Sequence, residues 1–108
     1  MKPINIFKSS AEFEVLKTGR LSQVAVMTLQ PGASSGDKME AHENSEQTLL
    51  VVEGEIEGQM ADENVTLKAG EFVLIPAGTP HRFTNKSDQP VVTFNVYAPP
   101  EYPADTKE

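Results

Sequence analysis

The sequence predicts an all-β fold of antiparallel strands, arranged as a sandwich or a barrel. Short runs rich in Val, Ile, Leu, Thr and Phe recur along the chain, and turn residues separate them about every eight to twelve positions. The turn residues are chiefly the 7 glycines and 8 prolines. A helix is expected only at residues 10–17, where Ser-Ser-Ala-Glu resembles a capping box. Everything else favours strands.

The first half of the predicted fold begins at residues 22–32, an apolar run that stops at Pro31-Gly32. A polar connection leads to a short strand at 38–42 and a tight turn at 42–46. Residues 47–53 then form a strand that is almost continuously apolar, which indicates a buried position. Gly54 ends this strand.

The second half begins with a hairpin over residues 55–68, whose turn is Ala-Asp-Glu-Asn. Three further strands follow, each separated from the next by glycine, proline or asparagine. They are expected at residues 71–76, 81–85 and 91–97. We therefore predict a single domain over residues 1–108, with a barrel core at about 20–98 and a tail or extended arm at 99–108.

Composition narrows the classes of partner. The chain has a net charge of −7 and no basic stripe, which disfavours nucleic acid and anionic membrane surfaces. It has no cysteine, so disulfides and thiolate metal sites are excluded. No apolar run has the length of a signal peptide or a membrane span, so we expect a cytoplasmic protein.

Four polar residues are candidates for a metal site: Glu40, His42, Gln47 and His81. Side chains two apart on a strand share a face, so Glu40 and His42 would project side by side. The turn at 42–46 brings Gln47 back toward the same interior. Two imidazoles and a carboxylate form a facial set suited to a divalent transition metal, and Gln47 adds an amide oxygen.

The segment at residues 70–85, GEFVLIPAGTPHRFTN, matches the pattern G-x5-P-x-G-x2-H-x3-N at every fixed position. This pattern resembles the second motif of the cupin superfamily. The first cupin motif, G-x5-H-x-H-x3,4-E-x6-G, fits when it is aligned backward from Gly54. Gln47 then occupies the glutamate position, His42 the second histidine position and Glu40 the first histidine position. The resemblance implies a double-stranded β-helix, or jelly-roll barrel, and covers residues 22–97.

Two of the four ligand positions therefore differ from the family pattern of three histidines and one glutamate. Taken together, the changes at Glu40 and Gln47 move the carboxylate from one position to another and leave the summed ligand charge at about −1, with both histidines neutral. A retained metal site is the hypothesis that this exchange favours. The alternative is that Gln47 does not bind the metal and instead donates a hydrogen bond that orients Glu40 or a bound water molecule.

The resemblance implies one divalent ion, with Fe, Mn, Ni, Zn and Cu not distinguishable, and a small-molecule ligand in the barrel. It suggests a dioxygenase, isomerase or decarboxylase; a non-catalytic binding protein and a structural barrel are the alternatives. Residues that would assist the chemistry are few, namely Tyr97, Lys38, Arg82, Glu43 and Glu46, and alternation places Arg82 away from His81. The resemblance also implies a homodimer, formed through edge strands in residues 1–19.

Overall fold

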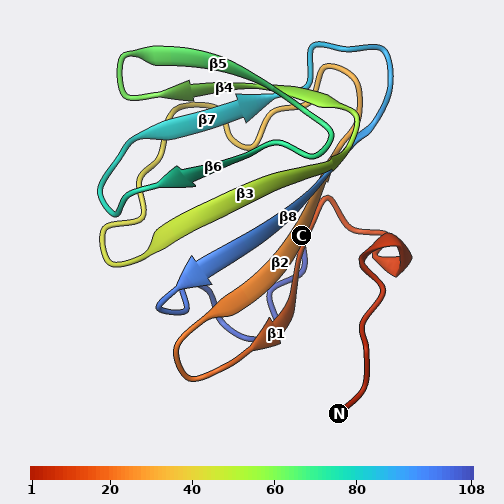
Figure 1. Ribbon diagram of the computed structural model, residues 1–108, viewed down its shortest axis with the longest axis vertical. Helices are drawn as coiled ribbons and strands as arrows, with labels where there is room; N and C mark the ends of the chain where they lie inside the picture. Colours follow the sequence, from red (N-terminus) through yellow and green to blue (C-terminus); the bar gives the residue numbers. More distant parts are fainter.

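The computed structural model describes residues 1–108 and consists of two antiparallel sheets (Figure 1). The larger sheet has the strand order β1-β2-β8-β3-β6, and the smaller has the order β5-β4-β7. The strands are β1 (Phe13–Thr18), β2 (Gln23–Leu29), β3 (Glu46–Glu53), β4 (Glu55–Met60), β5 (Glu63–Lys68), β6 (Phe72–Ile75), β7 (His81–Thr84) and β8 (Val91–Ala98). A single 3-10 turn, η1 (Ile6–Lys8), is the helical content, and no helix has the length and apolar character needed to cross a membrane.

The predicted all-β class is confirmed, and two expected elements are corrected. Residues 10–17 are not helical, because β1 covers most of them and its Val15 pairs with Ala25 of β2. Alternating apolar side chains at Phe13 and Val15 suit a half-buried strand better than a helix. The strand expected at 38–42 is reduced to one isolated bridge between Glu40 and His81.

The apolar core fills the space between the two sheets. Alternate residues of the strands point into it and form one cluster of nine buried side chains: Met27, Leu29, Leu49, Val51, Ile56, Leu67, Ile75, Phe83 and Val91. Gly58 makes room for the largest of them, since a Cβ atom there would lie 2.7 Å from Cε1 of Phe83. This packing fixes β7, which also carries His81.

The inward positions become polar toward one end of the barrel. On β3 the buried series runs from Val51 and Leu49 to Gln47, and on β8 it runs from Val91 to Asn95 and Tyr97. These two strands pair directly, so their polar ends lie together. Buried polar side chains gathered at one end of a barrel indicate a site.

Residues 99–108 form an extended arm that returns to β1. The backbone N–H of Val15 donates to the carbonyl of Thr106 at 2.9 Å, and Phe13 and Glu108 exchange two further backbone bonds. The darkest blue part of the chain therefore ends beside β1 and β2 (Figure 1). Because the arm pairs with β1, the edge that was expected to pair between subunits is already covered within one chain.

Candidate metal and ligand site

The polar end of the barrel encloses a cavity of about 410 Å³. All four sequence-predicted ligands, Glu40, His42, Gln47 and His81, line this cavity. The volume falls within the range of about 300–1,000 Å³ that is typical of small-molecule sites. Residues far apart in the sequence therefore line one cavity, and their role as metal ligands stays a prediction.

His81 opens β7 and is buried among the cavity walls. Its Nδ1 atom lies 2.9 Å from the carbonyl oxygen of Thr79. A carbonyl oxygen can only accept, so Nδ1 carries the proton and Nε2 keeps its lone pair. Burial lowers the pKa of the His81 imidazole from its ordinary value of 6.5, which favours the neutral form that metals bind.

His42 lies on the loop before β3 and faces His81. The centroids of the two rings are 5.1 Å apart, at an interplanar angle of 50°. The Nδ1 atom of His42 lies 3.1 Å from a carboxylate oxygen of Glu101, which belongs to the C-terminal arm. The two imidazoles therefore come from different parts of the barrel and meet in one cavity.

Gln47 holds an unpartnered oxygen at the same place. Its Nε2 atom donates to Oδ1 of Asn95 at 2.9 Å, whereas its Oε1 atom is buried and has no hydrogen-bond partner. A buried polar atom without a partner costs about 1–3 kcal/mol, so it calls for an explanation. The side-chain amide is in position to serve a ligand that this oxygen can contact.

A chain of hydrogen bonds determines which atom of the Gln47 side-chain amide has no hydrogen-bond partner. The carbonyl of Met27 accepts from Thr93 Oγ1, so Thr93 Oγ1 in turn accepts from Asn95 Nδ2. Asn95 must then present Oδ1 to Gln47, and only the Gln47 NH2 group can donate to it. The free atom is therefore the oxygen, which is the atom that coordinates metals.

Glu40 stands opposite His81 in the isolated bridge. The two residues exchange backbone hydrogen bonds of 3.0 and 2.9 Å, and opposed residues of an antiparallel pair project to one face. The Glu40 carboxylate lies beside Gly36: a Cβ atom placed on Gly36 would be 3.9 Å from its Oε1. It does not join the histidines, since no three His, Asp or Glu side chains are grouped closely enough to hold a metal.

The residues present fit a divalent transition metal by their chemistry. The cavity combines two imidazoles, a buried amide oxygen without a partner and a nearby carboxylate. Nitrogen and oxygen donors of this kind suit Mn, Fe, Ni, Cu or Zn. His42, His81 and Gln47 line one cavity, and the Glu40 carboxylate would have to turn toward the histidines to share an ion with them.

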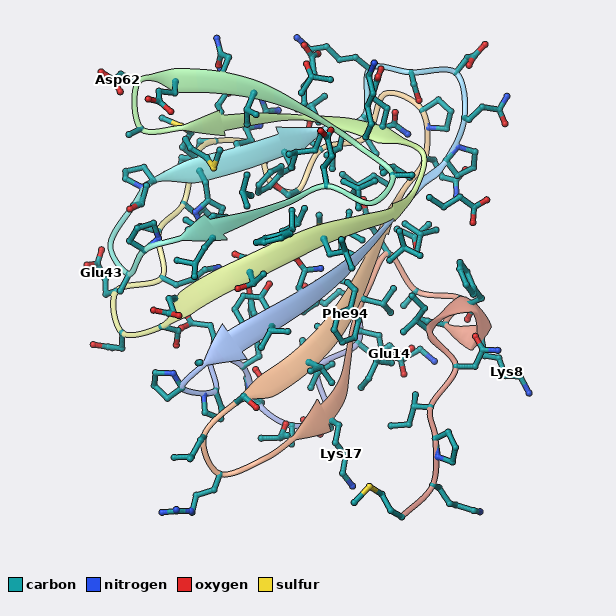
Figure 2. All side chains as sticks on the ribbon, in the orientation of Figure 1. Lys8, Glu14, Lys17, Glu43, Asp62 and Phe94 are labelled. Atoms are coloured by element: carbon teal, nitrogen blue, oxygen red, sulfur yellow. The ribbon has the colours of Figure 1, made fainter.

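The other expected helpers separate into two groups. Tyr97 and Lys38 line the cavity. Arg82 points away from it, as predicted, and donates to the carbonyl of Gly36 at 2.6 Å. Glu43 and Glu46 are exposed, and Figure 2 shows Glu43 at the outer rim of the molecule.

Burial raises the pKa of both tyrosines at the site, Tyr97 and Tyr102. Their hydroxyl groups therefore keep their protons at neutral pH and are able to donate hydrogen bonds. Neither is suited to act as a base.

The residues of the site that were not predicted include Asn95, Glu101 and Tyr102, together with the lining carboxylates Glu12 and Glu108. Asn95 was detectable, because it alternates with Thr93 and Tyr97 on a predicted strand. Glu101 and Tyr102 lie in a proline-rich polar segment with no strand signal, so their position in the fold could not be predicted.

Comparison with known proteins identifies several relatives. Protein BH2720 of Bacillus halodurans has a similar crystal structure, with a TM-score of 0.88, 31% sequence identity, and coverage of 95% of this chain and 81% of that one. The uncharacterized protein YrkC of Bacillus subtilis (strain 168) is 29% identical over 97 residues, which is 84% of this chain and 51% of YrkC. Quercetin 2,3-dioxygenase of the same organism is 30% identical over 70 residues, 65% of this chain but 20% of the dioxygenase.

This chain therefore spans about half the length of YrkC and a fifth of the dioxygenase. The family model described as "Cupin domain" (Cupin_2) matches residues 25–97. That range covers more than half of the 108 residues and contains both motifs. The chain belongs to the cupin family.

Proposed function

We propose that this cupin binds one divalent transition-metal ion through His42, His81 and Gln47, with Glu40 as the anionic ligand. The buried Oε1 atom of Gln47, which has no hydrogen-bond partner, supports the proposal most directly. A metal would satisfy that oxygen and offset the cost of burying it. When bound, such an ion supplies Lewis-acid or oxygen-activating chemistry.

We further propose that the cavity holds a small oxygenated molecule that is neutral or singly charged. The lining carries three carboxylates, from Glu12, Glu40 and Glu108, and one ammonium group, from Lys38. A divalent cation would balance this excess of negative charge, so a dianionic ligand would gain little from the site. Tyr97 and Tyr102 supply hydroxyl groups that donate to ligand oxygens.

Among dioxygenase, isomerase and decarboxylase, the likeness to quercetin 2,3-dioxygenase favours the first. Apart from the carboxylates of Glu40 and Glu101, the chain has little acid-base machinery near the histidines, because Arg82 faces away and both tyrosines keep their protons. This favours chemistry that depends on a bound ion over proton transfer between side chains. A binding protein without turnover is the alternative.

Metal analysis of protein purified without a histidine tag tests the proposal. We expect close to one equivalent of Fe, Mn, Ni, Zn or Cu per chain after supplementation with each metal. Oxygen uptake by Fe(II)-loaded protein, with a panel of vicinal diols, diphenols and hydroxyketones, then separates an oxygenase from a binding protein. Protein that stays free of metal under every supplementation would contradict the proposal.

Substitutions at Gln47 separate direct metal contact from a supporting role. Gln47→Glu places an anion where the amide oxygen lies, so we expect metal affinity to rise about tenfold. The metal-free protein should become less stable, because a second carboxylate oxygen would then face Asn95 Oδ1. Gln47→Ala should weaken binding only partly, by about tenfold. Affinity and thermal unfolding of each variant provide the measurement; unchanged affinity in Gln47→Glu would place Gln47 outside the metal's ligands.

The homodimer and the cytoplasmic location stay predictions. Pairing through the β1 edge is disfavoured by the C-terminal arm that already covers it. The opposite edge of the large sheet is β6, which exposes Phe72 and Leu74 by 64% and 52%. If two copies associate, these exposed apolar side chains support β6 as the place.

A further inference from the structure

The C-terminal arm brings a carboxylate to the side of His42. Oε2 of Glu101 lies 3.1 Å from Nδ1 of His42, which is hydrogen-bonding distance. Both side chains are mostly shielded from water, with exposed fractions of 12% for His42 and 25% for Glu101. A contact at this depth is stronger than a surface ion pair.

Glu101 is held in place independently of His42. The buried amide of Gln23 accepts from the backbone N–H groups of Glu101 and Tyr102, at 3.1 and 2.9 Å. The same amide donates to the carbonyl of Tyr102 at 2.8 Å. Its three bonds fix the arm to β2, so Glu101 is presented to the site by the backbone rather than drawn there by the histidine.

Each of the two histidines of the site has an oxygen acceptor beside its Nδ1 atom. His81 donates through Nδ1 to a backbone carbonyl, and His42 has a carboxylate at the same ring position. The His42 ring also packs in edge contact with a pair of tyrosines, with centroid distances of 5.3 Å to Tyr97 and 5.8 Å to Tyr102, and the two tyrosine rings contact each other at 5.2 Å. Together with His81, whose ring lies 5.1 Å away, these contacts restrict the orientation of the His42 ring, and the choice of tautomer then decides which nitrogen is free.

We propose that Glu101 is the positioning residue of His42: its carboxylate accepts the Nδ1 proton, and this leaves Nε2 as the free nitrogen that binds the metal. The proposal rests on the proposed function above. Histidine ligands commonly donate their second ring N–H to a carboxylate, and loss of that partner typically lowers metal affinity by about 10–100-fold. The arm is thereby part of the metal site, although it lies outside both cupin motifs.

The first test uses metal-free protein and does not depend on metal binding. Nitrogen-15 NMR, about two pH units above the ordinary imidazole pKa of about 6.5, reports which ring nitrogen of His42 carries the proton. We expect a single tautomer, protonated at Nδ1, in the wild type and in Glu101→Gln, whose amide oxygen still accepts. Glu101→Ala should show a mixture. An unchanged His42 tautomer in Glu101→Ala would overturn the proposal.

The second test measures affinity for Zn²⁺, a redox-inert probe, by competition with a chromophoric chelator. We expect Glu101→Ala to bind Zn²⁺ about 10–100-fold more weakly and Glu101→Gln to lie between it and the wild type. Glu43→Gln is the matched control, because it removes the same charge one residue from His42 on the exposed side. An equal loss in Glu43→Gln, or a tautomer shift in Glu101→Ala with no loss of affinity, would overturn the coupling to the metal. If the wild type binds no metal, the proposed function fails, and the NMR result still decides the role of Glu101.

Discussion

Substitution of His81 by alanine is expected to abolish metal retention, with affinity falling by more than the roughly 10–100-fold that follows loss of a supporting residue. His81 is buried, its Nδ1 proton is committed to Thr79, and its Nε2 atom is free to bind. Removing it leaves one imidazole, an amide oxygen and a carboxylate that must turn inward. Metal content after gel filtration and Zn²⁺ competition provide the measurement.

The same variant has a second expected effect, on the pH dependence of stability in the metal-free protein. Burial holds the pKa of His81 below its ordinary value of 6.5, so the unfolded chain binds a proton that the folded chain resists. The wild type should therefore lose stability as the pH falls through 6.5, and His81→Ala should lose less over that window. Urea unfolding midpoints at pH values above and below 6.5 test this.

These outcomes separate a ligand from a core histidine. Loss of metal together with the weaker pH dependence indicates a buried ligand. Full metal content in His81→Ala would contradict the proposed metal site, regardless of how the unfolding stability of the variant depends on pH. Glu43→Gln serves again as the control, because it keeps both histidines and their buried partners.

The strands were predictable from the sequence because turn residues mark where each one ends. The second motif also gave the positions of Pro76, Gly78 and His81, which follow one another within a single turn and strand. Asn85, the last fixed position of that motif, donates to the carbonyls of Leu29 and Gln89. Local spacing was sufficient for these features, since each depends on neighbours in the chain.

The remaining parts of the site depend on contacts across the chain. The sequence predicts a strand at Glu40, but the structure has only an isolated bridge there. The backbone of Glu40 pairs with that of His81, and no neighbouring residue continues the pairing. The sequence predicts a tail or extended arm at Glu101, and the structure shows that the buried Gln23 on β2 binds its backbone. A glutamine in an apolar strand does not indicate which segment it will bind, so these contacts could not be predicted from the sequence.

Substitution of Gly54 by alanine is expected to cause a large loss of stability, and the same substitution at Gly70 is its matched control. Gly54 and Gly70 have nearly the same φ, +91° and +92°, a region that side chains other than glycine rarely adopt. At Gly70 an added Cβ atom would meet nothing within 4 Å. At Gly54 it would lie 2.7 Å from the carbonyl oxygen of Pro90 and 3.0 Å from Cα of Val91. The two sites differ in packing rather than in backbone conformation.

Gly70→Ala should therefore carry only the conformational cost, about 1–3 kcal/mol of unfolding free energy. Gly54→Ala carries the same cost and adds a clash with backbone at the start of β8, of about 1–3 kcal/mol more. Val91 is fully buried there, so β8 cannot move away without disturbing the core.

Because a domain of this size has a stability of about 5–15 kcal/mol, Gly54→Ala should lower Tm by roughly 15 °C or more, and Gly70→Ala by roughly half as much. Thermal and urea unfolding of the two variants provide the measurement. Equal losses would show that the chain relaxes around Gly54, and that the contact between this turn and β8 does not hold the two strands in register. A larger loss at Gly54 would show that this glycine is required by the approach of β8 as well as by its own φ.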